Sequence, residues 1–163
     1  MAVQSFVKIW PHFKEGAYAV VFFGADDKAT KVFRQRYDAP REHVEKVFCS
    51  EFKAYQIAQS NPKLQPLIPA FFGRAQVCCV TDSQGKDISS EFYLDLAYQM
   101  EKIEGEFVKL GSLPSETTGA IQQLFRSAGV RHICDASVVE QCGSIKKVID
   151  FAVDEHELEH RPL

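Results

Sequence analysis

Lys31 and Glu51 are the two residues whose types and positions most directly suggest chemistry. The apolar periodicity predicts a helix over Arg41–Gln59, and Glu51 falls seven residues after Val44, on the apolar stripe of that helix. An ionised carboxylate on a buried face needs a cation, because an unpaired buried charge is costly. Lys31 is the natural partner. The alternative is that Glu51 lies at the edge of the stripe and reaches solvent.

A second pattern with chemical meaning is His156-Glu-Leu-Glu-His160, which matches H-E-x-x-H. On a helix this spacing puts two histidines on one face for Zn²⁺ and makes the first glutamate a general base, as in metalloproteases. The sequence stops soon afterwards, which leaves no place for a downstream third ligand. Acidic neighbours and Pro162 favour a charged, solvated tail over a zinc site, so the metalloprotease is the weaker alternative.

The elements that would position these residues follow from periodicity and turn residues. A hairpin is expected first, and in its second strand Lys31 and Phe33 share a face because alternate residues point the same way. The second helix is expected to begin after Ser115 as N-cap and to stop at Gly129. The predicted strands and helices are Ala17–Phe23, Ala29–Arg34, Arg41–Gln59, Arg74–Val80, Glu91–Met100, Glu116–Ala128, Val138–Glu140 and Lys146–Ile149.

The composition restricts the class of protein. With 163 residues, one compact domain is expected. A net charge of -3 argues against a nucleic-acid partner and against an acidic membrane surface. No apolar run approaches the roughly 18 residues of a transmembrane helix, and no secretory signal is present, so a cytoplasmic protein is expected. Export by a specialised secretion apparatus, including delivery into a host cell, stays open.

The five cysteines are scattered, without a C-x-x-C pair. Reduced and mostly buried thiols are therefore expected. Cys78 and Cys79 lie in an apolar run and are predicted to belong to the core of a strand.

The segment Ala128–Ala152 has the order helix end, tight loop, short strand, turn, short strand and an Asp-Phe pair. In this order, and together with strings earlier in the chain, it resembles the protein-kinase-like superfamily. The resemblance extends from about Ala17 to Ala152. The strings that carry it are Lys31-Val-Phe-Arg34, Ser50-Glu-Phe-Lys-Ala-Tyr55, Ile68-Pro-Ala-Phe-Phe-Gly73, Met100-Glu-Lys-Ile-Glu-Gly105 and Val148-Ile-Asp-Phe-Ala152.

The resemblance implies an α+β, kinase-like fold. Its N-lobe, over residues 1–103, would be a five-stranded antiparallel sheet with one main helix, and residues 104–163 would form a reduced C-lobe and a tail. Lys31 would hold the phosphates of ATP and pair with Glu51. Backbone groups of Glu101 and Ile103 in the hinge would meet the adenine, and Asp150 would hold Mg²⁺.

The departures from the family pattern concern the chemical step. The catalytic Asp of the family is replaced by His132, and the metal-binding Asn by Ser137. Asp135 could substitute for the missing carboxylate only if the loop slipped. No glycine-rich loop precedes the first strand, where only Gly16 is found, and the sequence ends before an activation segment or substrate-binding helices could follow.

We therefore expect a non-catalytic, pseudokinase-like interaction protein that binds a nucleotide weakly or not at all and acts by occupying a protein partner. The first alternative is an active, minimal ATP-dependent phosphotransferase with unusual catalytic residues. The second is an α+β domain in which Lys31 and Glu51 form a structural ion pair and Asp150 caps a turn. The identity of the protein partner cannot be read from the sequence.

Overall fold

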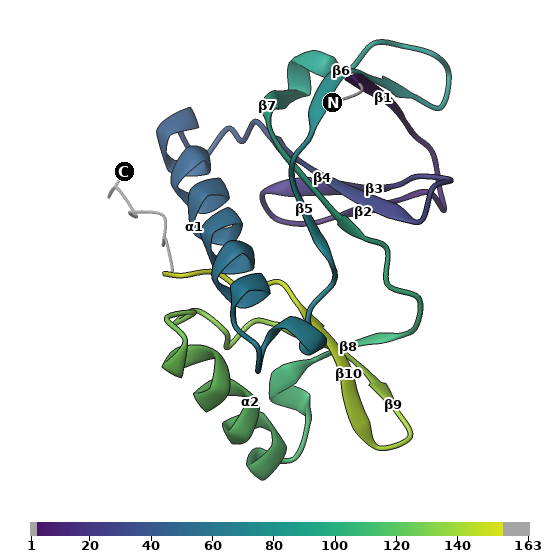
Figure 1. The fold of residues 1–163 in the computed structure, drawn as a ribbon. Coiled ribbons are helices and arrows are strands. Elements are labelled where there is room, and N and C mark those ends of the chain that lie inside the picture. Colours follow the sequence, from purple (N-terminus) through teal and green to yellow (C-terminus); the bar gives the residue numbers. More distant parts are fainter. Residues whose placement is uncertain (1–2, 155–163) are drawn as a thin grey trace. The chain divides into compact units, whose positions relative to one another are not determined.

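The structure is a computed structural model that describes residues 3–154, and it has an α+β fold (Figure 1). The α-helices are α1 (Arg41–Ser60) and α2 (Ser115–Ser127), and the short 3₁₀ helices are η1 (Gln65–Leu67), η2 (Ser89–Glu91) and η3 (Leu110–Ser112). The strands are β1 (Val3–Lys8), β2 (Phe13–Glu15), β3 (Ala19–Phe23), β4 (Lys28–Arg34), β5 (Phe71–Arg74), β6 (Gln76–Asp82), β7 (Phe92–Glu101), β8 (Phe107–Lys109), β9 (Ser137–Gln141) and β10 (Ser144–Ile149).

The described chain divides into two compact units. The first contains residues 3–48 and 72–102, and the second contains residues 49–71 and 103–154. The chain thus passes from one unit to the other inside α1, within β5 and directly after β7. Neither α1 nor α2 is both long and apolar enough to cross a membrane.

The first unit is built on a five-stranded sheet in the order β2-β3-β4-β7-β5. Strands β2, β3, β4 and β7 pair antiparallel, and Lys31 of β4 faces Val21 of β3 and Tyr98 of β7. The β-branched and aromatic residues of β3 and β4 suit a sheet that is buried on both faces. The predicted hairpin and the predicted five-stranded antiparallel sheet are therefore confirmed.

The two faces of this sheet have separate cores. On one face Phe33, Phe48 and Tyr98 form an aromatic cluster, with ring centroids 5.3 to 6.2 Å apart, which packs the first part of α1 onto the sheet. A second buried cluster contains Val20, Phe22, Val32, Ala75, Val77, Val80, Ile88, Phe92 and Ala97. Phe6 of β1 stacks on Phe22 at 5.0 Å and so attaches the small parallel sheet β1-β6 to this second cluster.

The second unit combines the rest of α1, helix α2 and a three-stranded sheet in the order β10-β9-β8. Its core is aromatic: Phe151 lies 4.5 Å from the ring of Tyr55 and 5.1 Å from that of Phe125. The end of the described chain is fixed to α1, because Ser50 Oγ donates to the carbonyl of Asp154 and accepts from its amide, both at 3.0 Å.

Several local expectations differ from the structure. Ser115 is the first residue of α2 and not its N-cap, because the extended residue before the helix is Pro114, and no side chain caps this end. The predicted strand Arg74–Val80 is the end of β5 followed by β6, and strands β1, β2 and β8 were not predicted. The expectation of mostly buried thiols is wrong: Cys49, Cys78, Cys134 and Cys142 are exposed and Cys79 is half-buried.

Candidate functional site

Lys31 lies in the middle of β4, in the first unit. Its ammonium nitrogen is 5.4 Å from the ring centroid of Phe33 and 5.9 Å from that of Tyr98. Lys31 and Phe33 therefore share a face, as the strand alternation predicted. Aromatic faces attract a cation, so these rings help to hold the ammonium group on the side of the sheet that bears the aromatic cluster.

Glu51, Asp150 and Tyr55 all belong to the second unit, and the charges of both carboxylates act on the phenol of Tyr55. Tyr55 is fully buried in the second unit, and burial raises its pKa well above the ordinary value. The negative charges of Asp150 and then Glu51 raise the pKa of Tyr55 further, since they oppose formation of a phenolate beside them. Glu51 itself is half-buried. Its predicted pairing with Lys31 stays a prediction, because Lys31 belongs to the other unit.

Asp150 has an unusual backbone conformation. It follows β10 with a φ of 63°, in the left-handed region that non-glycine residues rarely adopt. Its side chain is exposed, whereas the next residue, Phe151, is 1% exposed and anchored in the aromatic core. Conformations of this kind cluster at ligand-binding and catalytic positions.

The loop that carries His132 lies beside the loop that carries Asp150. The His132 amide donates a hydrogen bond to the Ala152 carbonyl at 3.1 Å, and the Ala152 amide donates one to the His132 carbonyl at 2.9 Å. Ser137 begins β9, is buried, and pairs with Ile149, the residue before Asp150. The predicted positions His132, Ser137 and Asp150 are thus brought together by the backbone of the second unit.

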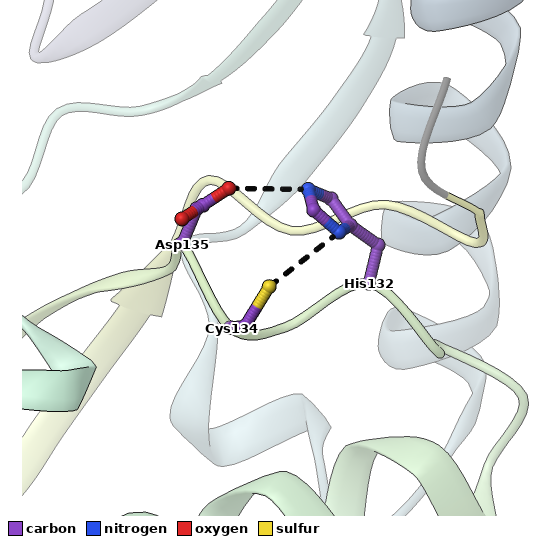
Figure 2. A group of neighbouring side chains, drawn as sticks. All are labelled: His132, Cys134 and Asp135. Atoms are coloured by element: carbon purple, nitrogen blue, oxygen red, sulfur yellow. Dashed lines mark hydrogen bonds and ion pairs between the residues drawn. The ribbon is translucent and has the colours of Figure 1, made fainter. Parts of the chain in front are cut away.

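A compact side-chain cluster surrounds the His132 ring (Figure 2). Asp135 Oδ2 lies 3.6 Å from His132 Nε2, and Cys134 Sγ lies 3.8 Å from Nδ1 on the other side of the ring. Cys134 was missed by the sequence reasoning, although the string His132-Ile-Cys-Asp135 contains three metal-ligand types within four residues. The signal that could have found it is the apolar Ile133 between them, which is buried and turns its neighbours outward.

The predicted hinge lies where the chain leaves the first unit. Glu101 is the last residue of β7 and pairs with Lys28, and the Lys102 amide donates to the Asp27 carbonyl at 2.8 Å. Ile103 is the first residue of the following segment of the second unit. The roles of Glu101 and Ile103 toward an adenine stay predictions. The His156–His160 string lies outside the described residues.

The first unit also contains an open cavity of about 590 Å³, lined by basic side chains at one end of the five-stranded sheet. Lys8 and Arg34 are both ion-paired with Glu15, and Arg36 with Asp38. Lys8 and Arg34 share one carboxylate, and Glu91 also lines the cavity. The three cations are therefore balanced by three carboxylates, and the cavity offers little net positive charge to a phosphate.

Comparison with protein-family models and with curated proteins finds no match to this chain.

The buried phenol of Tyr55 gives a testable pH dependence. Because its folded pKa is raised above the unfolded value of about 10, Tyr55 contributes stability that is complete below pH ~10 and is lost as the pH rises toward the folded pKa. In a spectrophotometric titration of the protein, the phenol of Tyr55 should ionise only when the protein unfolds. In Tyr55→Phe, the free energy of unfolding should decrease less than in wild type as the pH rises above about 10. Reversible ionisation of Tyr55 in the folded protein near pH 10 would contradict this assignment.

Proposed function

We propose that this chain is a kinase-like module that does not transfer phosphate and that acts by binding a protein partner. The observation that carries the proposal is an exposed apolar face on β1 and the turn after it, which we call the β1 face. It consists of Val3, Val7, Ile9 and Trp10, which are 61%, 51%, 42% and 78% exposed. Exposed apolar side chains are a feature of protein-binding sites, and these four lie within eight consecutive residues. An exposed tryptophan is a frequent anchor of such sites.

The backbone of β1 favours the same interpretation. Its residues alternate between exposed and half-buried, so Val3, Ser5 and Val7 project from the side opposite Phe6, which packs on the core. Within the described residues β1 pairs with β6 alone, which leaves its other edge without a neighbouring strand. An extended peptide can add to such an edge by main-chain hydrogen bonds, while the apolar side chains give specificity.

The kinase-like part of the proposal is supported by the second unit. The His132 loop and the Asp150 loop lie side by side, and Asp150 has the left-handed backbone conformation that is frequent at ligand sites. The non-catalytic part is supported by the residue types, because His132 and the buried Ser137 stand where the resemblance requires a catalytic carboxylate and a metal-binding amide.

One observation favours the active phosphotransferase as a second candidate. Asp135 lies 3.6 Å from His132 Nε2, so a carboxylate does accompany the histidine at the position of the missing Asp. A histidine oriented by a carboxylate can act as a general base toward a hydroxyl group. A direct assay of phosphate transfer separates the two candidates.

The β1 face is tested by affinity capture from the native host with Val7→Asp/Trp10→Ser. Truncating a buried tryptophan anchor typically costs 2 kcal/mol or more, so the double variant should bind the captured partner at least about 30-fold more weakly. The matched control is Tyr37→Ser, because Tyr37 is a fully exposed aromatic residue outside this face. Trp10, the single tryptophan of the chain, should also shift its emission when the purified partner binds wild-type protein. A partner that binds wild type and the double variant equally would contradict the assignment of the β1 face.

A further inference from the structure

We propose that His132, Cys134 and Asp135 form a binding site for a transition-metal ion, with Zn²⁺ as the ion that its donor atoms favour. The three residues offer one ring nitrogen, one sulfur and one carboxylate oxygen, all within 4.8 Å of one another. It is the one group of this kind within residues 3–154. The site goes beyond the proposed function and does not depend on it, because metal binding requires neither the β1 face nor a kinase-like role of His132.

Each of the two pairs that include His132 has a separation close to that in a metal site, and the three ligand atoms together lie within 4.8 Å. Bond lengths of about 2.3 Å to sulfur and about 2.0–2.2 Å to nitrogen and oxygen put the ligand atoms of a tetrahedral zinc site roughly 3.3–3.7 Å apart. The Cys134 Sγ to His132 Nδ1 distance is 3.8 Å, and the His132 Nε2 to Asp135 Oδ2 distance is 3.6 Å. Cys134 and Asp135 approach opposite nitrogens of the ring (Figure 2), so the ion would use one of them. The side chain of Asp135 is 75% exposed and can rotate to complete the set.

The backbone of this loop is fixed before any metal binds. Val130, Ile133 and Ala136 are all fully buried, and their spacing turns the side chains between them toward the surface. The amide of Ala136 donates to the Ile133 carbonyl at 3.2 Å, and the two hydrogen bonds between His132 and Ala152 hold the start of the loop. A fixed loop lowers the entropic cost of ordering ligands around an ion.

The chemistry of the donors selects the class of metal. A thiolate and an imidazole suit zinc and related transition-metal ions, whereas Mg²⁺ and Ca²⁺ prefer sets of oxygen ligands. Three protein ligands leave a fourth tetrahedral position for water or for a group from another molecule. Because Cys134 and Asp135 are exposed, an ion can reach the site from solvent.

The test is zinc binding by the full chain, freed of metal with a chelator and kept reduced, in competition with a chromophoric zinc indicator. We expect one Zn²⁺ per chain at this site. Co²⁺ should bind with an absorption band from thiolate-to-cobalt charge transfer. Cys134→Ser should abolish this band. Mutation of a residue that only orients a metal ligand typically lowers metal affinity roughly 10–100-fold. Because Cys134 and Asp135 would bind the ion directly, Cys134→Ser and Asp135→Asn should each lower zinc affinity by more than that. Both residues are exposed, so these variants should fold, which circular dichroism verifies.

Two matched controls separate this site from other donors. Cys142→Ser removes an exposed thiol from the turn between β9 and β10 and should leave zinc affinity and the cobalt band unchanged. His156→Ala/His160→Ala removes the histidines of the C-terminal string, and this double variant should also leave zinc affinity and the cobalt band unchanged. The proposal is overturned if no Zn²⁺ binds at micromolar concentration, if Cys134→Ser leaves binding intact, or if binding and the cobalt band are lost in the His156/His160 variant instead.

Discussion

Phe151→Ala is expected to lower the free energy of unfolding by about 3–5 kcal/mol, the usual cost of removing a buried aromatic ring. Phe151 is 1% exposed, and its ring contacts those of Tyr55 and Phe125, from α1 and α2, at 4.5 and 5.1 Å. Truncation would remove the contact that joins both helices to the segment after β10. A cavity at this point cannot be filled without moving one of these elements.

The measurement is urea unfolding followed by far-ultraviolet circular dichroism, with Phe72→Ala as the matched control. Phe72 is a phenylalanine that is 51% exposed, so its truncation should change stability by far less. Phe151 directly follows Asp150, the proposed ligand-binding position, whose φ is 63°. A loss of less than about 1 kcal/mol in Phe151→Ala would show that this aromatic core does not hold the second unit together.

The sequence predicted the elements whose signals are local. The strand pair around Lys31 and the helix from Arg41 have strong periodicity and clear end signals, and both were found with nearly the predicted bounds. Strand β1 was missed because its partner β6 is far away in the sequence, and such pairing leaves no local signal. The thiol of Cys78 was predicted to be buried, yet it lies on the exposed side of β6, where it contacts the hydroxyl of Ser5 at 3.0 Å.

The functional roles of the candidate site residues stay predictions, and the contacts among these residues could not be predicted from the sequence. His132, Ser137 and Asp150 were identified from their order in the chain, and the structure adds the hydrogen bonds that bring their loops together. Cys134 was missed although the string His132-Ile-Cys-Asp135 contains three metal-ligand types, and its contact with the His132 ring depends on the turn around the buried Ile133. The pairing of Lys31 with Glu51 rests on the resemblance and on helical spacing.

Our central proposal is that this chain is a kinase-like module that binds a protein and transfers no phosphate. It is tested most directly by incubating the full chain with γ-labelled ATP and Mg²⁺, with general protein substrates present. Protein kinases turn over about 1–100 times per second, so an active enzyme would give a large signal. The assay includes Lys31→Met and Asp150→Asn, with Lys28→Met as the matched control. Lys28 is a lysine of the same strand as Lys31, and its ammonium nitrogen also lies near an aromatic ring, 5.2 Å from the ring centroid of Phe72.

We expect phosphate incorporation at the level of the protein-free background for wild type and for all three variants. Thermal stabilisation by ATP and Mg²⁺ that is lost in Lys31→Met or Asp150→Asn would then identify a nucleotide-binding module. If ATP and Mg²⁺ do not raise the melting temperature, the chain is a pure interaction module. Mg²⁺-dependent incorporation by wild type and by Lys28→Met, abolished by Lys31→Met or Asp150→Asn, would overturn the proposal and establish an active phosphotransferase.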